Sequence, residues 1–265
     1  MNKVLKASMA IAATGLVGFG LATSNVSADS YKSELKHKGE LTVGLEGTYA
    51  PFSYKDKHGK LVGYDVEVAK AVAKKLDLKP VFVQTKFDSL VAGLDSNKYD
   101  VVYNDMGPTK ERKQHYTFGG TYLNSKAVII VKKGSDIKTV KDLKGKKAAQ
   151  TTSSNYGQAA QKAKAQIVSA PGFAEALDLV SSGKADATLN ADDAWSVYKK
   201  QHPKTDLKAI PTDDLDASGA APMLSKKDKK LAKKITKAQN ELKKDGTLTK
   251  LSKEYFGKDL SGSKN

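Results

Sequence analysis

Segments with strand-like patterns alternate with segments with helix-like patterns along most of the 265-residue chain, and this alternation limits the fold more than any other feature. Short apolar or alternating runs predict strands at residues 41–45, 81–84, 100–103, 127–131, 166–169 and 185–189. Apolar residues at helical spacing predict helices between these runs, within residues 66–76, 87–94, 156–163 and 173–180. The order predicts an α/β protein with mainly parallel sheets.

The N-terminal residues 1–28 have the pattern of a secretory signal peptide. Lys3 and Lys6 precede an uncharged run of small apolar residues, and Val-Ser-Ala at 26–28 is typical of a cleavage site. The chain has no cysteine, so disulfides, thiolate metal sites and a lipid-modified cysteine are excluded. We therefore expect an exported protein without a lipid anchor.

The formal net charge is +16, and loss of the two lysines of the signal segment would lower it to +14. This excess favours anionic partners. Because the lysines are scattered and arginine is almost absent, we expect no nucleic-acid partner. The densest run, residues 225–244, predicts an amphipathic helix docked on the protein. An alternative is that its lysine face binds anionic polymers or phospholipid at the cell surface, which would associate the protein with that surface by charge.

Four loops follow the predicted strands and define the candidate ligand site. In open α/β sheets, ligands bind beyond the carboxyl ends of the strands. The loops read EGTYAPF after residues 41–45, NDMGPTKER after 100–103, QTTSSN after a strand that follows Gly145, and NADDAW after 185–189. The topology allows all four to face one cleft.

Arg112, in the second of these loops, is the single arginine of the chain. A guanidinium group is a planar fork that matches a carboxylate through two hydrogen bonds, which a lysine cannot do. We expect it to bind the α-carboxylate of a free amino acid, although a chance survivor paired with Glu111 or a surface aspartate is equally compatible with this residue alone. The candidates to bind the α-amine of that amino acid are four acidic residues: Glu46, Asp105, Asp192 and Asp193.

Other residues of the four loops have two interpretations each. Tyr49 and Phe52 offer aromatic faces to a ligand, but Phe52 suits a core position and Tyr49 a surface cap. Thr152 and Ser153 offer hydroxyl groups at a helix start, whereas Asp192 or Asp193 suits a helix N-cap.

Catalytic and metal-binding patterns are weak. The four histidines lie in lysine-rich or polar stretches, and no metal, nucleophile or phosphate-loop motif is present. We therefore expect no enzyme activity, no metal and no cofactor. An enzyme on the same scaffold stays open as a minor alternative, since Glu46 could act as an acid or base.

Several stretches, in this order, resemble the extracellular solute-binding proteins of ABC transporters for polar amino acids: LTVGLEGTYAPFSYKDKHGKLVGYDVEVAKAVAKKL, DVVYNDMGPTKERKQHYTFGGTYL, VKDLKGKKAAQTTSSN, GKADATLNADDAW and ELKKDGTLTKLSKEYFG. The resemblance implies the two-lobed type II periplasmic-binding-protein fold with two hinge crossovers. It places lobe one at residues 29–122 and 222–265 and lobe two at 123–221. It also implies an amino acid or cystine ligand, a membrane permease as partner, and a monomer.

The resemblance assigns roles within the loops. Arg112 matches the residue that holds the ligand α-carboxylate, and Thr152 and Ser153 match hydroxyl residues that assist from the other lobe. Glu46, Tyr49 and Phe52 match the acidic and aromatic wall of the family's ligand site. The full predicted ligand-binding set is Glu46, Tyr49, Phe52, Asn104, Asp105, Gly107, Arg112, Thr152, Ser153 and Asp192.

Three departures from the family pattern affect the ligand and the localisation. Asn190 is followed by Ala191 where the family has the amine-binding aspartate, so either the loop shifts to deliver Asp192, or Glu46 or Asp105 substitutes, or the amine is held weakly. Asn104-Asp105 replaces the Asn-Gln often seen in cystine binders. The missing lipid-anchor cysteine is shared with similar surface adhesins, so adhesion to mucus, collagen or anionic surfaces is the alternative function.

Overall fold

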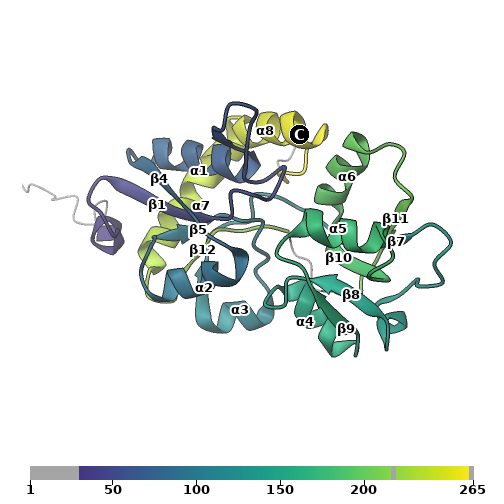
Figure 1. Cartoon of the computed structure of the whole chain (residues 1–265). Helices are drawn as coiled ribbons and strands as arrows, with labels where there is room; N and C mark the ends of the chain where they lie inside the picture. Colours follow the sequence, from purple (N-terminus) through teal and green to yellow (C-terminus); the bar gives the residue numbers. More distant parts are fainter. Residues whose placement is uncertain (1–29, 216–218, 263–265) are drawn as a thin grey trace, which may run out of the picture.

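The structure is a computed structural model that describes residues 30–215 and 219–262. The predicted signal peptide lies outside these residues. Figure 1 shows two groups of helices and strands, with segments of the chain passing between them. The predicted α/β class is confirmed, with one five-stranded sheet in each group.

The first sheet has the strand order β4-β1-β5-β12-β6. Its strands are β1 (Glu40–Leu45), β4 (Lys79–Gln84), β5 (Val101–Val102), β6 (Tyr116–Phe118) and β12 (Met223–Ser225). β1 runs parallel to β4 and β5, whereas β12 is antiparallel to both of its neighbours. A strand from near the C-terminus thus completes a sheet that the N-terminal part begins.

The second sheet has the order β11-β7-β10-β8-β9. Its strands are β7 (Ala127–Lys132), β8 (Lys147–Gln150), β9 (Gln166–Ser169), β10 (Ala187–Ala191) and β11 (Leu207–Pro211). β8 is parallel to β9 and β10, whereas β7 is antiparallel to β10 and β11. The prediction of mainly parallel sheets is therefore wrong. The first strand after the chain leaves the first sheet, β7, and the strand on its return, β12, both run against their neighbours.

The helices cover the sheets in two sets. The first sheet carries α1 (Tyr64–Lys75), α2 (Phe87–Asp95), α3 (Lys110–His115), α7 (Lys229–Lys244) and α8 (Thr247–Phe256). The second carries α4 (Asn155–Lys162), α5 (Phe173–Ser181) and α6 (Asp192–Gln201). Short elements complete the order: 3₁₀ turns Ser30–Glu34 and Val140–Leu143, and the hairpin β2 (Tyr54–Lys55) and β3 (Leu61–Val62).

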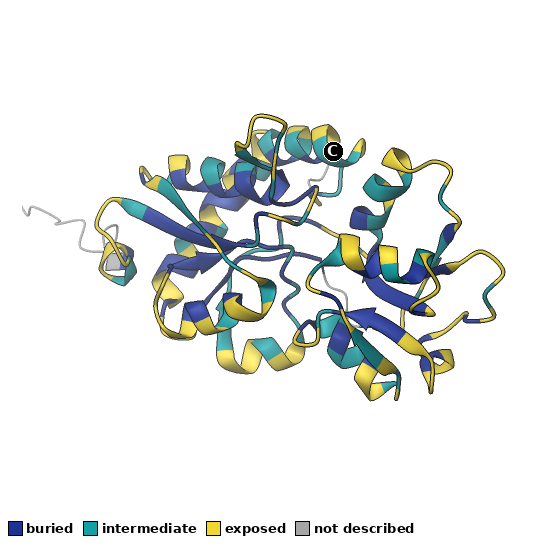
Figure 2. Ribbon diagram, viewed as in Figure 1, coloured by how far each residue is buried: buried dark blue, intermediate teal, exposed yellow. Residues whose placement is uncertain are grey.

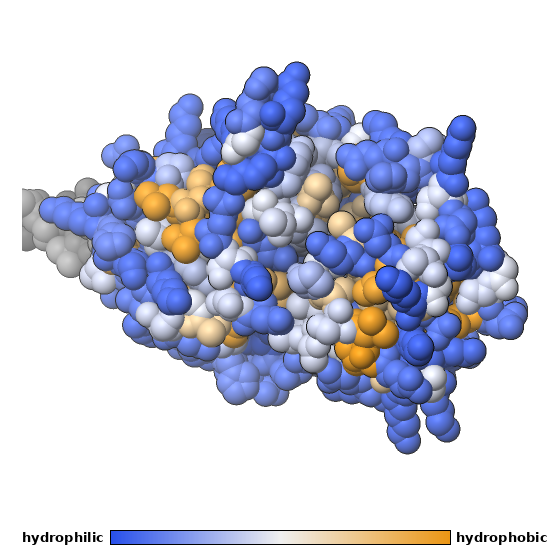
Figure 3. All heavy atoms as spheres, in the orientation of Figure 1, coloured by the Kyte–Doolittle hydropathy of each residue, from blue (hydrophilic) through white to orange (hydrophobic). Residues whose placement is uncertain are grey.

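α7 is amphipathic, as its sequence predicts. Leu231, Ile235 and Leu242 are buried in the core beneath the first sheet, together with residues of α1 and β1. The lysines on its opposite side, such as Lys233 and Lys237, are exposed. Figure 2 shows the same division across the molecule, with buried strands inside and exposed residues on the outer helix faces. Hydrophilic residues cover most of the face seen in Figure 3.

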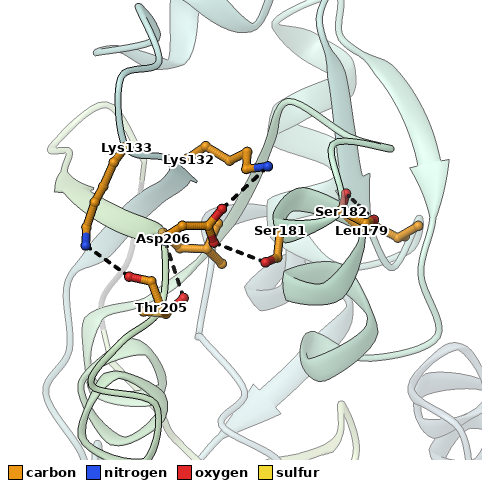
Figure 4. A network of polar contacts seen from close by, with 8 residues as sticks. Lys132, Lys133, Leu179, Ser181, Ser182, Thr205 and Asp206 are labelled. Carbon is orange, nitrogen blue, oxygen red and sulfur yellow. Dashed lines mark hydrogen bonds and ion pairs between the residues drawn. The ribbon is translucent and has the colours of Figure 1, made fainter.

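A polar network fastens the outer end of the second sheet (Figure 4). Asp206, next to β11, forms an ion pair with Lys132 at the end of β7 over 3.4 Å. The Ser181 hydroxyl at the end of α5 donates to Asp206 over 3.1 Å. These contacts join a helix to two strands at the surface, away from the ligand loops.

The two segments that connect the sheets lie side by side. Tyr122 N donates to Ala220 O over 2.9 Å, and Ala220 N donates to Leu123 O over 2.8 Å. Gly219 has a φ of +75°, and a Cβ there would lie 2.1 Å from Leu123 O. Only glycine permits this close approach, so the paired segments form a narrow joint between the two halves. In residues 30–215 and 219–262, no helix has the length and apolar character needed to cross a membrane.

Candidate functional site

A cavity of about 70 Å³ lies where the four candidate loops, two from each half of the protein, meet. The first half contributes Glu46, Tyr49, Phe87, Asn104 and Asp105. The second contributes Gln150, Thr151, Ser154, Asn155, Tyr156, Gly172, Phe173, Ala176, Thr188, Leu189 and Asn190. The four loops expected to converge therefore all reach one cavity.

Glu46 and Asn104 fix the ends of β1 and β5 against each other. Glu46 N donates to Asn104 Oδ1 over 2.8 Å, and Asn104 Nδ2 donates to Glu46 Oε2 over 2.7 Å. Burial raises the pKa of Glu46 to about 7, and Glu175 and Asp88 add to this, although the Asn104 bond opposes it. Near neutral pH this carboxyl is therefore poised between a hydrogen-bond donor and an anion.

Tyr49 reaches from the first half to the second. Its hydroxyl lies 3.2 Å from Asp105 Oδ2 and 3.0 Å from Asn190 Oδ1. Its ring packs 4.7 Å from the ring of Phe52 and edge-on to Phe173 at 6.4 Å. Phe52 itself is fully buried in the core beneath Tyr49 and does not line the cavity. It supports the aromatic wall without forming its surface.

Asp105 is held in place by a buried aspartate of α1. Asp65 Oδ2 accepts from Asp105 N over 2.7 Å, and Asp65 Oδ1 accepts from the Tyr122 hydroxyl over 2.8 Å. Burial raises the pKa of Asp65 to about 7, and it raises the pKa of Asp105 well above its usual range, with the negative charges of Asp193 and Asp65 adding to the effect. Asp65 thus links a site residue to the joint between the halves.

Arg112 lies beside the cavity on the short helix α3. The Thr109 hydroxyl at the helix N-cap accepts from Arg112 N over 3.2 Å, and Arg112 Nη1 donates to Gly107 O over 3.1 Å. Among the described residues, its guanidinium has no carboxylate within ion-pair distance and no other hydrogen-bond acceptor. Burial lowers the pKa of Arg112 to about 10. The alternative that it survives as half of a surface ion pair does not fit this geometry.

A second cavity, of about 320 Å³, adjoins the first on the side of α3. Thr109 lines it, and Asn155 and Tyr156 line both cavities. Arg112 is not a lining residue of either, but its charge acts on the Tyr156 hydroxyl, whose pKa burial raises well above its usual range. Gly107 is outside both linings and lies against Gly219 of the returning crossover.

The start of α4 places different hydroxyl groups from those predicted. Thr151 and Ser154 line the cavity, and Ser154 caps the helix by accepting from Gly157 N over 2.9 Å. Thr152 and Ser153 are exposed and outside the lining. The Ser153 hydroxyl donates instead to the carboxylate of Asp88 on α2, which is a direct contact between the two halves.

Asp192 is engaged at the joint. Its Oδ1 accepts from Lys126 N over 2.9 Å, and its own N donates to Lys126 O over 2.8 Å. The loop therefore does not shift to deliver Asp192 into the cavity, and Asp105 and Glu46 are the carboxyl groups that line it. Asp193, the other candidate, is fully buried and outside the lining.

Sequence reasoning missed several lining residues. Gln150, Thr151 and Asn190 lie in the four loops, but one to three positions from the residues predicted there. The sequence pattern places Phe87, Tyr156 and Phe173 only on apolar helix faces, although each stands in the first turn of its helix, at the end that faces the site. The signal that finds them is their position at the helix start. No group of three or more histidine or acidic side chains within the described ranges is arranged to hold a metal ion.

Known proteins resemble this chain over nearly its full length. Residues 41–258 match the family described as bacterial extracellular solute-binding proteins, family 3. The L-cystine-binding protein TcyA of Bacillus subtilis is 40% identical over 269 residues, which cover 98% of this chain and 100% of that protein.

Two solved structures add the fold. The L-cystine solute receptor of Neisseria gonorrhoeae, in its unliganded open conformation, is 44% identical and superposes with a TM-score of 0.59 over 88% of this chain and 99% of its own. An ancestral arginine-binding protein bound to arginine is 38% identical, with a TM-score of 0.75 over 83% of this chain and 99% of its own. The two sheets and their helices thus form the type II periplasmic-binding-protein fold, and the chain belongs to family 3 of the bacterial extracellular solute-binding proteins.

Proposed function

We propose that this protein is the extracellular substrate-binding component of an ABC importer and takes a polar amino acid or cystine into the cavity between its lobes. The observation that carries the proposal is Arg112, a half-buried guanidinium beside the cavity without a carboxylate partner among the described residues. A charge removed from water in this way is costly unless an anion completes it. The α-carboxylate of an amino acid supplies that anion.

The other loops supply the rest of an amino-acid site. The first turn of α4 presents backbone N–H donors that favour a negative group. The Thr151 and Ser154 hydroxyls hold this turn in place by donating to Ala170 O over 2.9 Å and to Thr151 O over 2.7 Å. Asp105 binds the ligand amine, since the Asp192 carboxylate already accepts a hydrogen bond from Lys126 N. The ligand side chain extends toward Glu46 between Phe87 and Phe173. A cystine ligand or a cationic side chain brings a second positive group that suits the Glu46 carboxylate.

The lobes follow the two sheets. We assign residues 29–122 and 222–265 to lobe one and 123–221 to lobe two, with the paired crossovers as the hinge. We infer that this structure is the closed form, because its TM-score is higher with the arginine-bound protein than with the unliganded open receptor, although the latter is more similar in sequence. Ligand binding favours closure, and a permease in the membrane recognises the closed form. The monomer performs no chemistry and needs no cofactor.

Export by the segment at residues 1–28 places the protein outside the cell, where the lysine-rich exterior favours association with anionic polymers. The relatives described above are named for solute binding. Adhesion to mucus or collagen therefore stays a prediction from the sequence, without a structural observation that favours it.

A thermal-shift screen of ligand-stripped protein against the amino acids and cystine tests the function. A ligand at about 100 times its Kd adds about 2.7 kcal/mol to the free energy of unfolding, so the true ligand raises the Tm clearly. Arg112→Lys keeps the charge but removes the planar fork, and we expect it to abolish the shift. Lys113→Ala, on the exposed side of the same helix, is the matched control and keeps the shift. Absence of any shift at millimolar ligand would contradict the proposal.

A further inference from the structure

Three aspartates from separate segments lie close to the boundary between the lobes. Asp65 lies on α1, Asp105 follows β5, and Asp193 lies on α6. Asp65 and Asp193 are 0% exposed, and Asp105 is half-buried. None of the three forms an ion pair with a lysine or arginine in the described part of the chain. Buried carboxylates without a cation are costly in free energy.

The hydrogen bonds around Tyr49 are short of one proton. Its hydroxyl has a single hydrogen, but it faces two acceptors, Asp105 Oδ2 and Asn190 Oδ1. The orientation of the Asn190 amide is set by its own Oδ1, which accepts from Ala191 N over 2.7 Å. If Asp105 carries a proton, it donates to the Tyr49 oxygen and Tyr49 donates to Asn190. A proton on Asp105 therefore satisfies the whole chain of contacts from lobe one to lobe two.

Asp193 also has an unsatisfied carboxyl oxygen. Its Oδ1 accepts from Ala194 N over 2.5 Å, whereas its buried Oδ2 has no hydrogen-bond partner among the described residues. An ionised oxygen in this position would carry negative charge in an enclosed site beside other carboxyl groups. Protonation removes that charge.

We propose that Asp105 of lobe one and Asp193 of lobe two form a carboxyl pair that takes up a proton when the lobes close, so that acid favours closure of the empty receptor. The inference rests on the closing two-lobed receptor proposed above. Asp65 is not a member of the pair, because its carboxylate already accepts hydrogen bonds from two groups of lobe one, Asp105 N and the Tyr122 hydroxyl.

The surroundings of the pair are mainly acidic or neutral. The ionisable groups that act on Asp105 or Asp193, or on the Tyr49 hydroxyl beside them, are Asp65, Asp192, Glu46, Tyr49, Tyr64, Tyr122, Tyr156, Arg112 and Lys258. Arg112 and Lys258 are the two cations among them. They do not offset burial, which raises the pKa of Asp193 to about 7 and that of Asp105 well above its usual range.

The sign of the pH effect follows from these directions. In the open form the two carboxyl groups regain water, and their pKa values return toward the ordinary value of about 3.8. Because closure raises both pKa values, the closed form binds more protons. The contribution of protonation to the free energy of closure is then fully present below the open-form pKa. It is progressively lost as pH rises through about 7, the value for Asp193. At neutral pH, the ammonium group of a ligand at Asp105 supplies the positive charge in place of the proton.

Fluorescence energy transfer in ligand-free protein tests the proposal. The chain has no cysteine, so Lys57→Cys in lobe one and Lys184→Cys in lobe two, both exposed, accept a dye pair specifically. As pH falls from about 8 to about 5, we expect the ratio of closed to open molecules to rise by up to about tenfold per pH unit for each proton taken up.

Neutral amides isolate the pair. At pH about 8, Asp105→Asn and Asp193→Asn should each increase the closed fraction, and the double variant should show little pH response, since an amide does not gain a proton in this range. Asp213→Asn changes an exposed aspartate and should leave the wild-type profile unaltered. A flat wild-type profile, or an unchanged profile in a folded double variant, overturns the proposal. If the double variant fails to fold, an unchanged profile in both single variants overturns it equally. No ligand is used, so failure here is distinct from failure to bind an amino acid.

Discussion

A single tyrosine hydroxyl spans the boundary between the lobes, and its removal should weaken ligand binding. Tyr49→Phe keeps the ring that packs on Phe52 but removes the hydroxyl that faces Asp105 and Asn190. A buried hydrogen bond contributes about 0.5–1.5 kcal/mol, and acceptors left unpaired add to the loss. We expect ligand affinity to fall by about 10-fold, measured by isothermal titration calorimetry.

The control for Tyr49 is Tyr54→Phe, a partly buried tyrosine on β2 outside the cavity lining. We expect it to bind ligand as the wild type does. Equal affinities for wild type and Tyr49→Phe would show that the hydroxyl does not stabilise the closed, ligand-bound form.

How far single residues can be predicted depends on what fixes them. Arg112 stands out in the sequence because guanidinium chemistry is specific and the chain has no second arginine, and its carboxylate-binding role stays a prediction. The sequence pattern predicts Thr152 and Ser153 instead of Thr151 and Ser154, because the direction of a hydroxyl at a helix start depends on which residue caps the helix. Ser154 takes that position and turns Ser153 outward. The amine site could not be fixed, since the role of Asp192 depends on a long-range contact with Lys126.

Between secondary-structure elements, the close contact of the two crossovers predicts a large cost for a side chain at Gly219. Gly219→Ala places a Cβ 2.1 Å from Leu123 O in addition to the strain of a φ of +75°. Strain of this kind alone costs about 1–2 kcal/mol, and the clash must add to it. We expect urea denaturation to show a loss larger than this strain alone.

Gly183→Ala is a matched control, because Gly183 also has a φ of +75° but no atom lies within 4 Å of the position that an alanine Cβ would take there. The difference between the two variants therefore measures the clash at the crossovers. If both variants lose the same free energy of unfolding, the crossovers are not in tight contact.

The elements themselves were largely predictable. Residues 166–169 match β9, and the apolar spacing of α7 gives its buried face. β10 begins two residues later than predicted and ends two residues later, because its register is set by pairing with β7 and not by its own apolar run. The antiparallel direction of β7 and β12 could not be predicted from their own sequences. The direction of a strand in a sheet depends on the side from which the chain enters the sheet.

At the scale of the whole molecule, contacts between segments far apart in the sequence connect the two lobes. Ser153 of lobe two donates to Asp88 of lobe one, and Tyr49 of lobe one reaches Asn190 of lobe two. Sequence patterns indicate which loops meet, but they do not distinguish a side chain that touches ligand from one that touches the other lobe. For Ser153 the two roles predict different energetics.

A double-mutant cycle of Ser153→Ala and Asp88→Ala separates these roles through ligand affinity. If the hydroxyl acts by holding the lobes together, removing either partner destroys the same contact. Each single variant should then weaken binding by about 0.5–1.5 kcal/mol, which is about 2- to 12-fold, and the double variant should be no weaker than the worse single one. Thr152→Ala, at the neighbouring exposed position, should have no effect. Additive losses would mean instead that Ser153 contacts the ligand independently of Asp88.

Because both side chains are exposed at the lobe boundary, the contact can break on opening without a buried group losing its partner. It can therefore stabilise the closed form while still allowing the ligand to be released.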